Sequence, residues 1–94
     1  MANKSKSHDS APSVKIVVLD RGFVYVGRVT LDDKFCTITN AKNIRRWGTT
    51  QGLGELALKG PQPNTVLDNT GTVQAPMRAV LELIATEAAL WNGI

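Results

Sequence analysis

A period-two alternation of apolar residues begins at Val14 and constrains the first half of the chain more than any other feature. The segment VKIVVLD places Ile16 and Val18 on one face of a strand, and Val17 and Leu19 on the other. The dipeptide RG supplies the turn that follows, and LDDK supplies a second turn before the alternating segment FCTITNA. Successive strands joined by tight turns predict an antiparallel meander.

The strand between these two turns, FVYVGRVTL, is expected to bend sharply. Its apolar residues Phe23, Tyr25, Val29 and Leu31 share one face, and Gly27 lies between them. Glycine is unfavourable in the middle of a strand, so its presence there predicts a bulge or bend that lets a short sheet curl over itself.

The second half of the chain is less regular. The segment GLGELALKGP predicts a short helix or an irregular loop, with a short strand as the alternative, and TVLDNTGTVQAP predicts a hairpin around Asn69-Thr70-Gly71. MRAVLELIA predicts a strand to about Ile84, followed by a short helix TEAALW that Thr86 caps. Its content of Ala, Leu and Glu keeps a helix over residues 77–90 open. The strand would carry Met77, Ala79, Leu81 and Leu83 on one face, and Val80 and Ile84 on the other.

Size bounds the fold, because the chain has 94 residues and few aromatic side chains. A domain of this length buries about 60% of the surface of its unfolded chain, so we expect a homo-oligomer. Residues 1–13 are predicted to be a disordered polar tail, and residues 14–94 a single small β domain. The strand, bent strand and strand that open the domain resemble SH3-like and Sm-like proteins. The bent strand, about five short strands and the short terminal helix together predict a mainly β fold, a small five-stranded barrel, open or closed, with a short C-terminal helix. The resemblance brings no RNA-contacting sequence with it.

Charge is unevenly distributed along the chain. Residues 1–48 carry nine Lys or Arg against four Asp, a balance of +5, whereas residues 49–94 carry two against four acids, a balance of −2. This asymmetry permits an anionic partner, although a dedicated duplex binder is normally more basic. The single cysteine, Cys36, excludes an intramolecular disulfide framework and fits a reducing cytoplasm. No apolar run approaches the ~20 residues that cross a bilayer, so we expect a cytoplasmic protein without a membrane partner.

The segment IRRWGTTQGLGEL, residues 44–56, concentrates groups that recognise phosphorylated ligands. Arginine binds phosphate in a bidentate manner, tryptophan offers a face for stacking, and threonine adds hydroxyl donors. Glycine lets backbone N–H groups approach an anion closely. The spacing matches neither a P-loop nor a dinucleotide-binding fingerprint, so the signal is one of composition. The predicted ligand-binding residues are Arg45, Arg46, Trp47, Thr49, Thr50, Gly52 and Gly54.

A structural interpretation of the same segment stays open. Trp47 would then close the bottom of a small barrel, and the glycines would only form turns. Continued alternation places Arg46 on one face of the strand and Arg45 and Trp47 on the other, so that one arginine lines a site while its neighbour is solvated. The acids considered as partners of Arg45 are Asp20, Asp32, Asp33 and Glu55.

The sequence predicts no catalytic residue, cofactor or metal ligand. The only histidine, His8, lies in the predicted tail, which leaves the folded part without a histidine base or a multi-histidine metal site. Cys36 lies on an apolar strand face with no histidine to activate it, which favours a small buried side chain. Asp32 and Asp33 belong to a turn signal, with a divalent ion in an oligomer as the alternative. We therefore expect a protein that is not an enzyme.

The segments NAKNIRRWGTTQGLGELALKGP and TVLDNTGTVQAP together resemble a family of small uncharacterised proteins encoded by phages and prophages. In that family an Arg-Arg-Trp-Gly-Thr segment leads into a Gly-Leu-Gly-Glu-Leu-Ala segment. The resemblance extends over most of the chain after Val14. It implies a viral or mobile-element origin, and a role in virion assembly, host takeover or counter-defence in the host cytoplasm.

Three kinds of partner are consistent with these features. The first is a phosphorylated small molecule, such as a nucleotide or a nucleotide-derived host defence signal, which a non-catalytic accessory protein sequesters in pockets between subunits. The second is a protein, as for a phage structural or host-factor-binding module, because Arg and Trp are equally typical of protein hot spots. The third is single-stranded nucleic acid, with Tyr25, Phe23 and Trp47 as the rings available for stacking.

Overall fold

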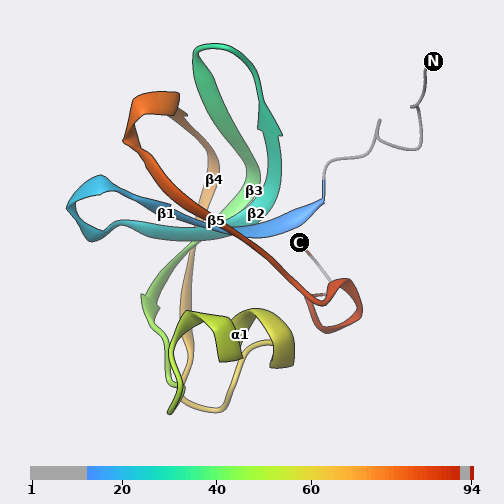
Figure 1. Cartoon of the computed structure of the whole chain (residues 1–94). Helices are drawn as coiled ribbons and strands as arrows, with labels where there is room; N and C mark the ends of the chain where they lie inside the picture. Colours follow the sequence, from blue (N-terminus) through green and yellow to red (C-terminus); the bar gives the residue numbers. More distant parts are fainter. Residues whose placement is uncertain (1–12, 92–93) are drawn as a thin grey trace.

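The computed structural model describes residues 13–91 and 94, which form a five-stranded antiparallel sheet with one short α-helix (Figure 1). Helix α1 (Leu53–Lys59) lies between the third and fourth strands in sequence. The strands are β1 (Val14–Leu19), β2 (Val24–Leu31), β3 (Phe35–Arg46), β4 (Val66–Pro76) and β5 (Val80–Ala85). The 3-10 turns are η2 (Asp20–Gly22), η3 (Met77–Ala79) and η4 (Ala88–Leu90). The expected mainly β fold with five strands is confirmed.

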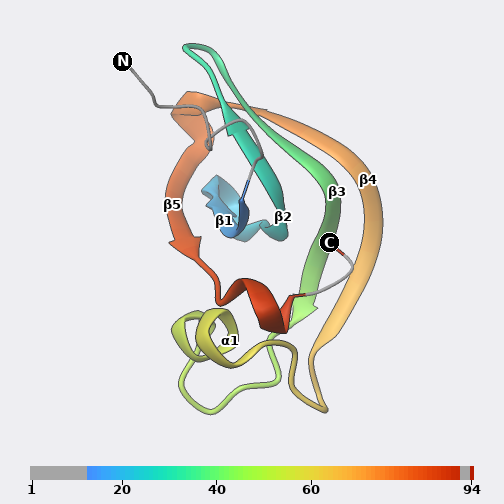
Figure 2. The ribbon, with the colours of Figure 1, turned by 90° about the vertical axis from the view of Figure 1, so that its right-hand side faces the viewer.

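The strand order is β4-β3-β2-β1-β5, so the two strands that follow each other at the end of the chain lie at opposite edges of the sheet. Figure 2 shows β5 on one side of β1 and β2, with β3 and β4 on the other side. The 3-10 turn η3 joins the two edge strands at the top of this view, and α1 lies with the C-terminal turn at the bottom. The sheet is therefore strongly curved, with its edges brought together at one end.

Strand β1 is buried on both faces, because two apolar clusters lie on its two sides. Val14 and Ile16 belong to one cluster and Val17 and Leu19 to the other, as the alternation of the sequence predicts. The helix-side cluster consists of Val14, Ile16, Val24, Val26, Ile44, Leu56, Ala57, Trp91 and Ile94. The sheet cluster consists of Val17, Leu19, Val29, Cys36, Ile38, Ala41 and Ala75.

The predicted bend in β2 is confirmed at Gly27. The pairing of β2 with β3 shifts register between Val26 and Arg28, on either side of this glycine. A Cβ atom at position 27 would lie 2.6 Å from Cγ2 of Ile38 and 3.0 Å from the carbonyl oxygen of Thr39. Glycine is needed here because β3 passes too close for any side chain.

The predictions for the third and fourth strands require correction. Strand β3 continues beyond the predicted segment to Arg46. The hairpin predicted around residues 69–71 is wrong, because β4 runs without a turn from Val66 to Pro76 and pairs with β3 along its length. Register shifts on both sides of the Ala41–Gly71 pair absorb the turn-forming residues as bulges instead.

The end of the chain follows the predicted strand but not the predicted faces. Strand β5 ends at Ala85, which excludes a helix over residues 77–90. Leu81 is exposed instead of sharing a face with Met77 and Leu83, whereas Val80 packs with those two against the sheet cluster. The cause is a register shift in the β1–β5 pairing, in which Leu19 faces Val80 and Val18 faces Glu82.

The predicted C-terminal helix is a single 3-10 turn, η4. Thr86 does not cap it, because the Thr86 hydroxyl donates a hydrogen bond to the Val14 carbonyl at 2.7 Å. The predicted tail, apart from Ser13, lies outside the described residues, and His8 lies there as well. Within the described part of the chain, no helix has the length and apolar character needed to cross a membrane.

Candidate functional site

The predicted ligand-binding segment lies where β3 ends and the chain turns into α1. Its backbone runs beside the segment that enters β4. A Cβ atom at Gly48 would lie 2.4 Å from the carbonyl carbon of Asn64, and the Thr65 hydroxyl donates a hydrogen bond to the Trp47 carbonyl at 2.6 Å. These contacts hold the end of β3 in place, so Arg45, Arg46 and Trp47 project from a supported backbone.

Arg45 and Arg46 are both exposed. The β3–β4 pairing shifts register between Ile44 and Arg46, which makes Arg45 the additional residue of a bulge. The Arg45 guanidinium then reaches Asp68 on β4. Its Nε donates to Oδ2 at 2.8 Å, and its Nη2 donates to Oδ1 at 3.4 Å. None of the four acids considered from the sequence is this partner.

The ion pair leaves the two side chains 65% and 45% exposed. The hydrogen bond from the guanidinium to Asp68, together with the carboxylate charge, raises the pKa of Arg45 above its ordinary value. Exposed pairs of this kind contribute little to stability. Arg45 therefore stays charged and exchanges its carboxylate partner at low cost.

Unlike Arg45, the side chains of Arg46 and Trp47 have no polar partner in the described part of the chain. The Arg46 guanidinium makes no hydrogen bond or ion pair with any residue that the structure describes. The side chain of Trp47 is 42% exposed. A Cβ atom added at Gly52 would lie 3.9 Å from Cζ3 of its ring. Trp47 consequently does not close the core. Trp91, which the sequence did not single out, is the core tryptophan and is only 2% exposed.

Two hydroxyl and two backbone N–H donors of the loop already have acceptors within the segment from Thr49 to Glu55. The Thr49 hydroxyl donates to the Gly52 carbonyl at 2.9 Å and accepts from the Gly52 N–H at 3.1 Å. The Glu55 carboxylate accepts from the Gln51 N–H at 2.8 Å and from the Thr50 hydroxyl at 3.1 Å. Glu55 thus takes the position that an external anion would need. Gly54 follows Leu53 inside the first turn of α1, and a Cβ atom there would meet nothing within 4 Å.

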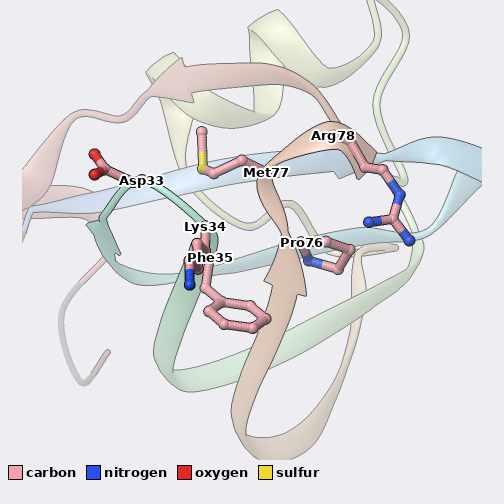
Figure 3. Close-up of a pocket in the computed structure, with 6 residues that line it drawn as sticks. All are labelled: Asp33, Lys34, Phe35, Pro76, Met77 and Arg78. Carbon is pink, nitrogen blue, oxygen red and sulfur yellow. The ribbon is translucent and has the colours of Figure 1, made fainter.

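A surface pocket of about 400 Å³ lies at the other end of β3 and β4 (Figure 3). It is lined by Asp33, Lys34, Phe35, Pro76, Met77 and Arg78. Asp32 stiffens the turn beside it, because its Oδ1 accepts the N–H groups of Lys34 at 2.7 Å and Phe35 at 2.8 Å. These hydrogen bonds lower the pKa of Asp32, with the one from Phe35 having the larger effect. The turn role that the sequence predicts for Asp32 is confirmed.

Sequence reasoning did not single out this pocket. Its two halves lie about forty positions apart in the chain, and only the β3–β4 register, which places Phe35 opposite Pro76, brings them together. The signal available in the sequence was an aromatic residue, Phe35, directly after Lys34. An aromatic side chain at the first position of a strand is common, however, and does not by itself indicate a site.

Cys36 is buried in the sheet cluster, as predicted, and this burial raises the pKa of its thiol. The thiol is therefore protonated at neutral pH and poorly suited to act as a nucleophile. Among the described residues, no group of three or more histidine, cysteine or acidic side chains is arranged to hold a metal ion.

Comparison of the chain with protein families, with curated proteins and with solved structures finds no match.

Proposed function

We propose that this protein is a non-catalytic binding protein that takes a phosphorylated ligand with a planar group, such as a nucleotide, at Arg46 and Trp47. One observation carries the proposal: the side chains of Arg46 and Trp47 are adjacent and exposed, and neither makes a hydrogen bond within the described chain or belongs to its core. A guanidinium binds phosphate, and an indole face stacks on a planar ring, so the pair supplies both halves of nucleotide recognition.

The contacts inside the loop narrow the predicted set of ligand-binding residues. Thr49, Thr50 and Gly52 already bond to the loop itself or to Glu55, so they shape the site without contributing free donors. Arg45 joins the site if a ligand phosphate replaces Asp68, since that carboxylate is half exposed. Two adjacent guanidinium groups and one indole then form the binding surface.

The wider role that we propose follows the resemblance to phage-encoded proteins. The chain would act in the host cytoplasm as an accessory protein that sequesters a nucleotide or a nucleotide-derived defence signal, and it would do so as a homo-oligomer. The strand order and the short turn η3 between the edge strands support assignment to the small SH3-like or Sm-like barrels.

Titration calorimetry with a panel of cyclic and linear nucleotides tests this function. We expect a saturable heat of binding for at least one member of the panel. The Arg46→Gln variant should bind at least about tenfold more weakly, because a charge-assisted hydrogen bond contributes about 1.5–3 kcal/mol. The affinity of Trp47→Ala for the nucleotide should fall by a similar factor, because the stacking contact with the base is removed.

Arg21→Gln is the matched control, because Arg21 is an exposed arginine in the turn η2. Its affinity should equal that of the parent protein. A circular dichroism spectrum of each variant checks that the fold is intact. Equal binding by the parent and the Arg46→Gln variant, or no binding across the panel, would reject the proposed site.

A protein partner is the second candidate function, and a separate observation favours it. Seven large apolar side chains are exposed in the described part of the chain: Phe23, Leu31, Phe35, Trp47, Leu58, Leu81 and Leu90. Exposed apolar and aromatic side chains can serve as the anchors of a protein interface. If Trp47 is such a contact, Trp47→Ala should abolish partner binding while no nucleotide of the panel competes.

A further inference from the structure

We propose that the pocket between the β2–β3 turn and η3 receives Leu81 and Glu82 of a second copy of this chain, and that the two copies exchange these contacts in a two-fold dimer. The proposal concerns a different end of the molecule from Arg46 and Trp47, so it stands or falls independently of the ligand.

The pocket has an apolar floor and a basic rim. Phe35, Pro76 and Met77 supply the apolar surface, and Phe35 remains 39% exposed. Neither the Lys34 ammonium nor the Arg78 guanidinium bonds to a described residue. Asp33 is the one acid in the lining, and Figure 3 shows it at the opposite end of the pocket from Arg78. An occupant with an apolar group and a carboxylate therefore fits this pocket.

The backbone around the pocket is already ordered, so an occupant has little left to arrange. The Met77 N–H donates to the Lys34 carbonyl at 2.9 Å, which ties η3 to the β2–β3 turn. The register of β3 and β4 places Phe35 opposite Pro76. A preformed surface lowers the entropic cost of binding.

Leu81 and Glu82 offer the matching chemistry. Leu81 is the additional residue of the bulge between β1 and β5, and this position leaves its side chain 66% exposed. Glu82 comes next in the chain, is exposed, and has no ion pair with any residue that the structure describes. A projecting leucine followed by an unpaired carboxylate is thus complementary to an apolar floor beside Lys34 and Arg78.

The spacing of the two features suits a two-fold contact. Leu81 follows Arg78 by three residues, so their Cα atoms lie no more than about 11 Å apart. Leu81 therefore lies close to the edge of the pocket that Arg78 forms. A two-fold axis between them places each Leu81 in the pocket of the other copy, as an isologous interface requires.

Analytical ultracentrifugation from micromolar to millimolar concentration tests the proposal with the full chain. We expect a concentration-dependent dimer with twice the mass of one chain. Leu81→Asp should raise the dissociation constant at least about tenfold, because an apolar anchor is replaced by a charge. Glu82→Arg and Arg78→Glu should each weaken the dimer, and the double variant that combines them should recover it.

Leu58→Asp is the matched control, since Leu58 lies on α1 and is also 66% exposed. This variant should dimerise like the parent. A parent protein that stays monomeric throughout, or a dimer that Leu58→Asp disrupts and Leu81→Asp does not, overturns the proposal. Failure of the double charge reversal to restore what the single changes lose removes the ion-pair part of it. Nucleotide titration of the same variants reports separately on Arg46 and Trp47.

Discussion

Gly48, in the loop between β3 and α1, has no room for a Cβ atom. Its φ of 70° is left-handed, and the backbone of Asn64 and Thr65 fills the space that a Cβ would need. We expect Gly48→Ala to lose more stability than the roughly 1–2 kcal/mol that left-handed backbone alone costs an L residue. Urea denaturation followed by circular dichroism measures this loss.

Gly22→Ala separates the two contributions at the same scale. Gly22 has a similar φ of 82°, but a Cβ there would meet nothing within 4 Å. The Gly22→Ala variant should lose only the stability that left-handed backbone costs an L residue. Equal losses in the two variants would mean that the approach of residues 64 and 65 to Gly48 contributes nothing to stability.

Helix α1 is the element that connects the loop to the core. Its Leu56 and Ala57 are buried in the helix-side cluster, whereas Gly54 in its first turn is exposed with open space around it. Alanine is a better helix former, so Gly54→Ala should raise the free energy of unfolding by up to about 1 kcal/mol. Thermal melts measure the gain. If Gly54 also admits a ligand, nucleotide affinity should fall in the same variant that becomes more stable, and unchanged affinity would remove Gly54 from the predicted site.

At the scale of the whole molecule, the C-terminal segment completes the helix-side cluster, because Trp91 and Ile94 are buried in it. The Trp91 indole N–H donates to the Ala57 carbonyl at 3.3 Å, and the Glu87 N–H donates to the same oxygen at 3.0 Å. Trp91→Ala should cost about 3–5 kcal/mol, a large share of the roughly 5–15 kcal/mol that holds a small domain together. Trp47→Ala is the control and should cost much less, since Trp47 is 42% exposed. A comparable loss of melting temperature in both variants would contradict this assignment of the core tryptophan.

Strands and turns with a clear local pattern were predictable from the sequence. The alternation in β1 identified both buried faces, and the turn residues beside Asp32 and the isolated Gly27 marked the turn and the bend. The groups of the candidate site could also be identified from the sequence, because the binding chemistry of arginine, tryptophan and glycine depends on the residue type. The partner of Arg45 was not, because Asp68 lies 23 positions away on another strand.

The sequence by itself determined the class of fold and the segment rich in binding groups, since both depend on residue type and short-range spacing. Only the tertiary structure decided which of those groups stay available. Bulges in the β3–β4 and β1–β5 pairings exposed Arg45 and Leu81, and the turn into α1 placed Glu55 on the loop donors. A bulge shifts every later side chain relative to its partner strand, and its position depends on how two distant strands fit together. That fit is a property of the folded sheet, which no local window of the chain contains.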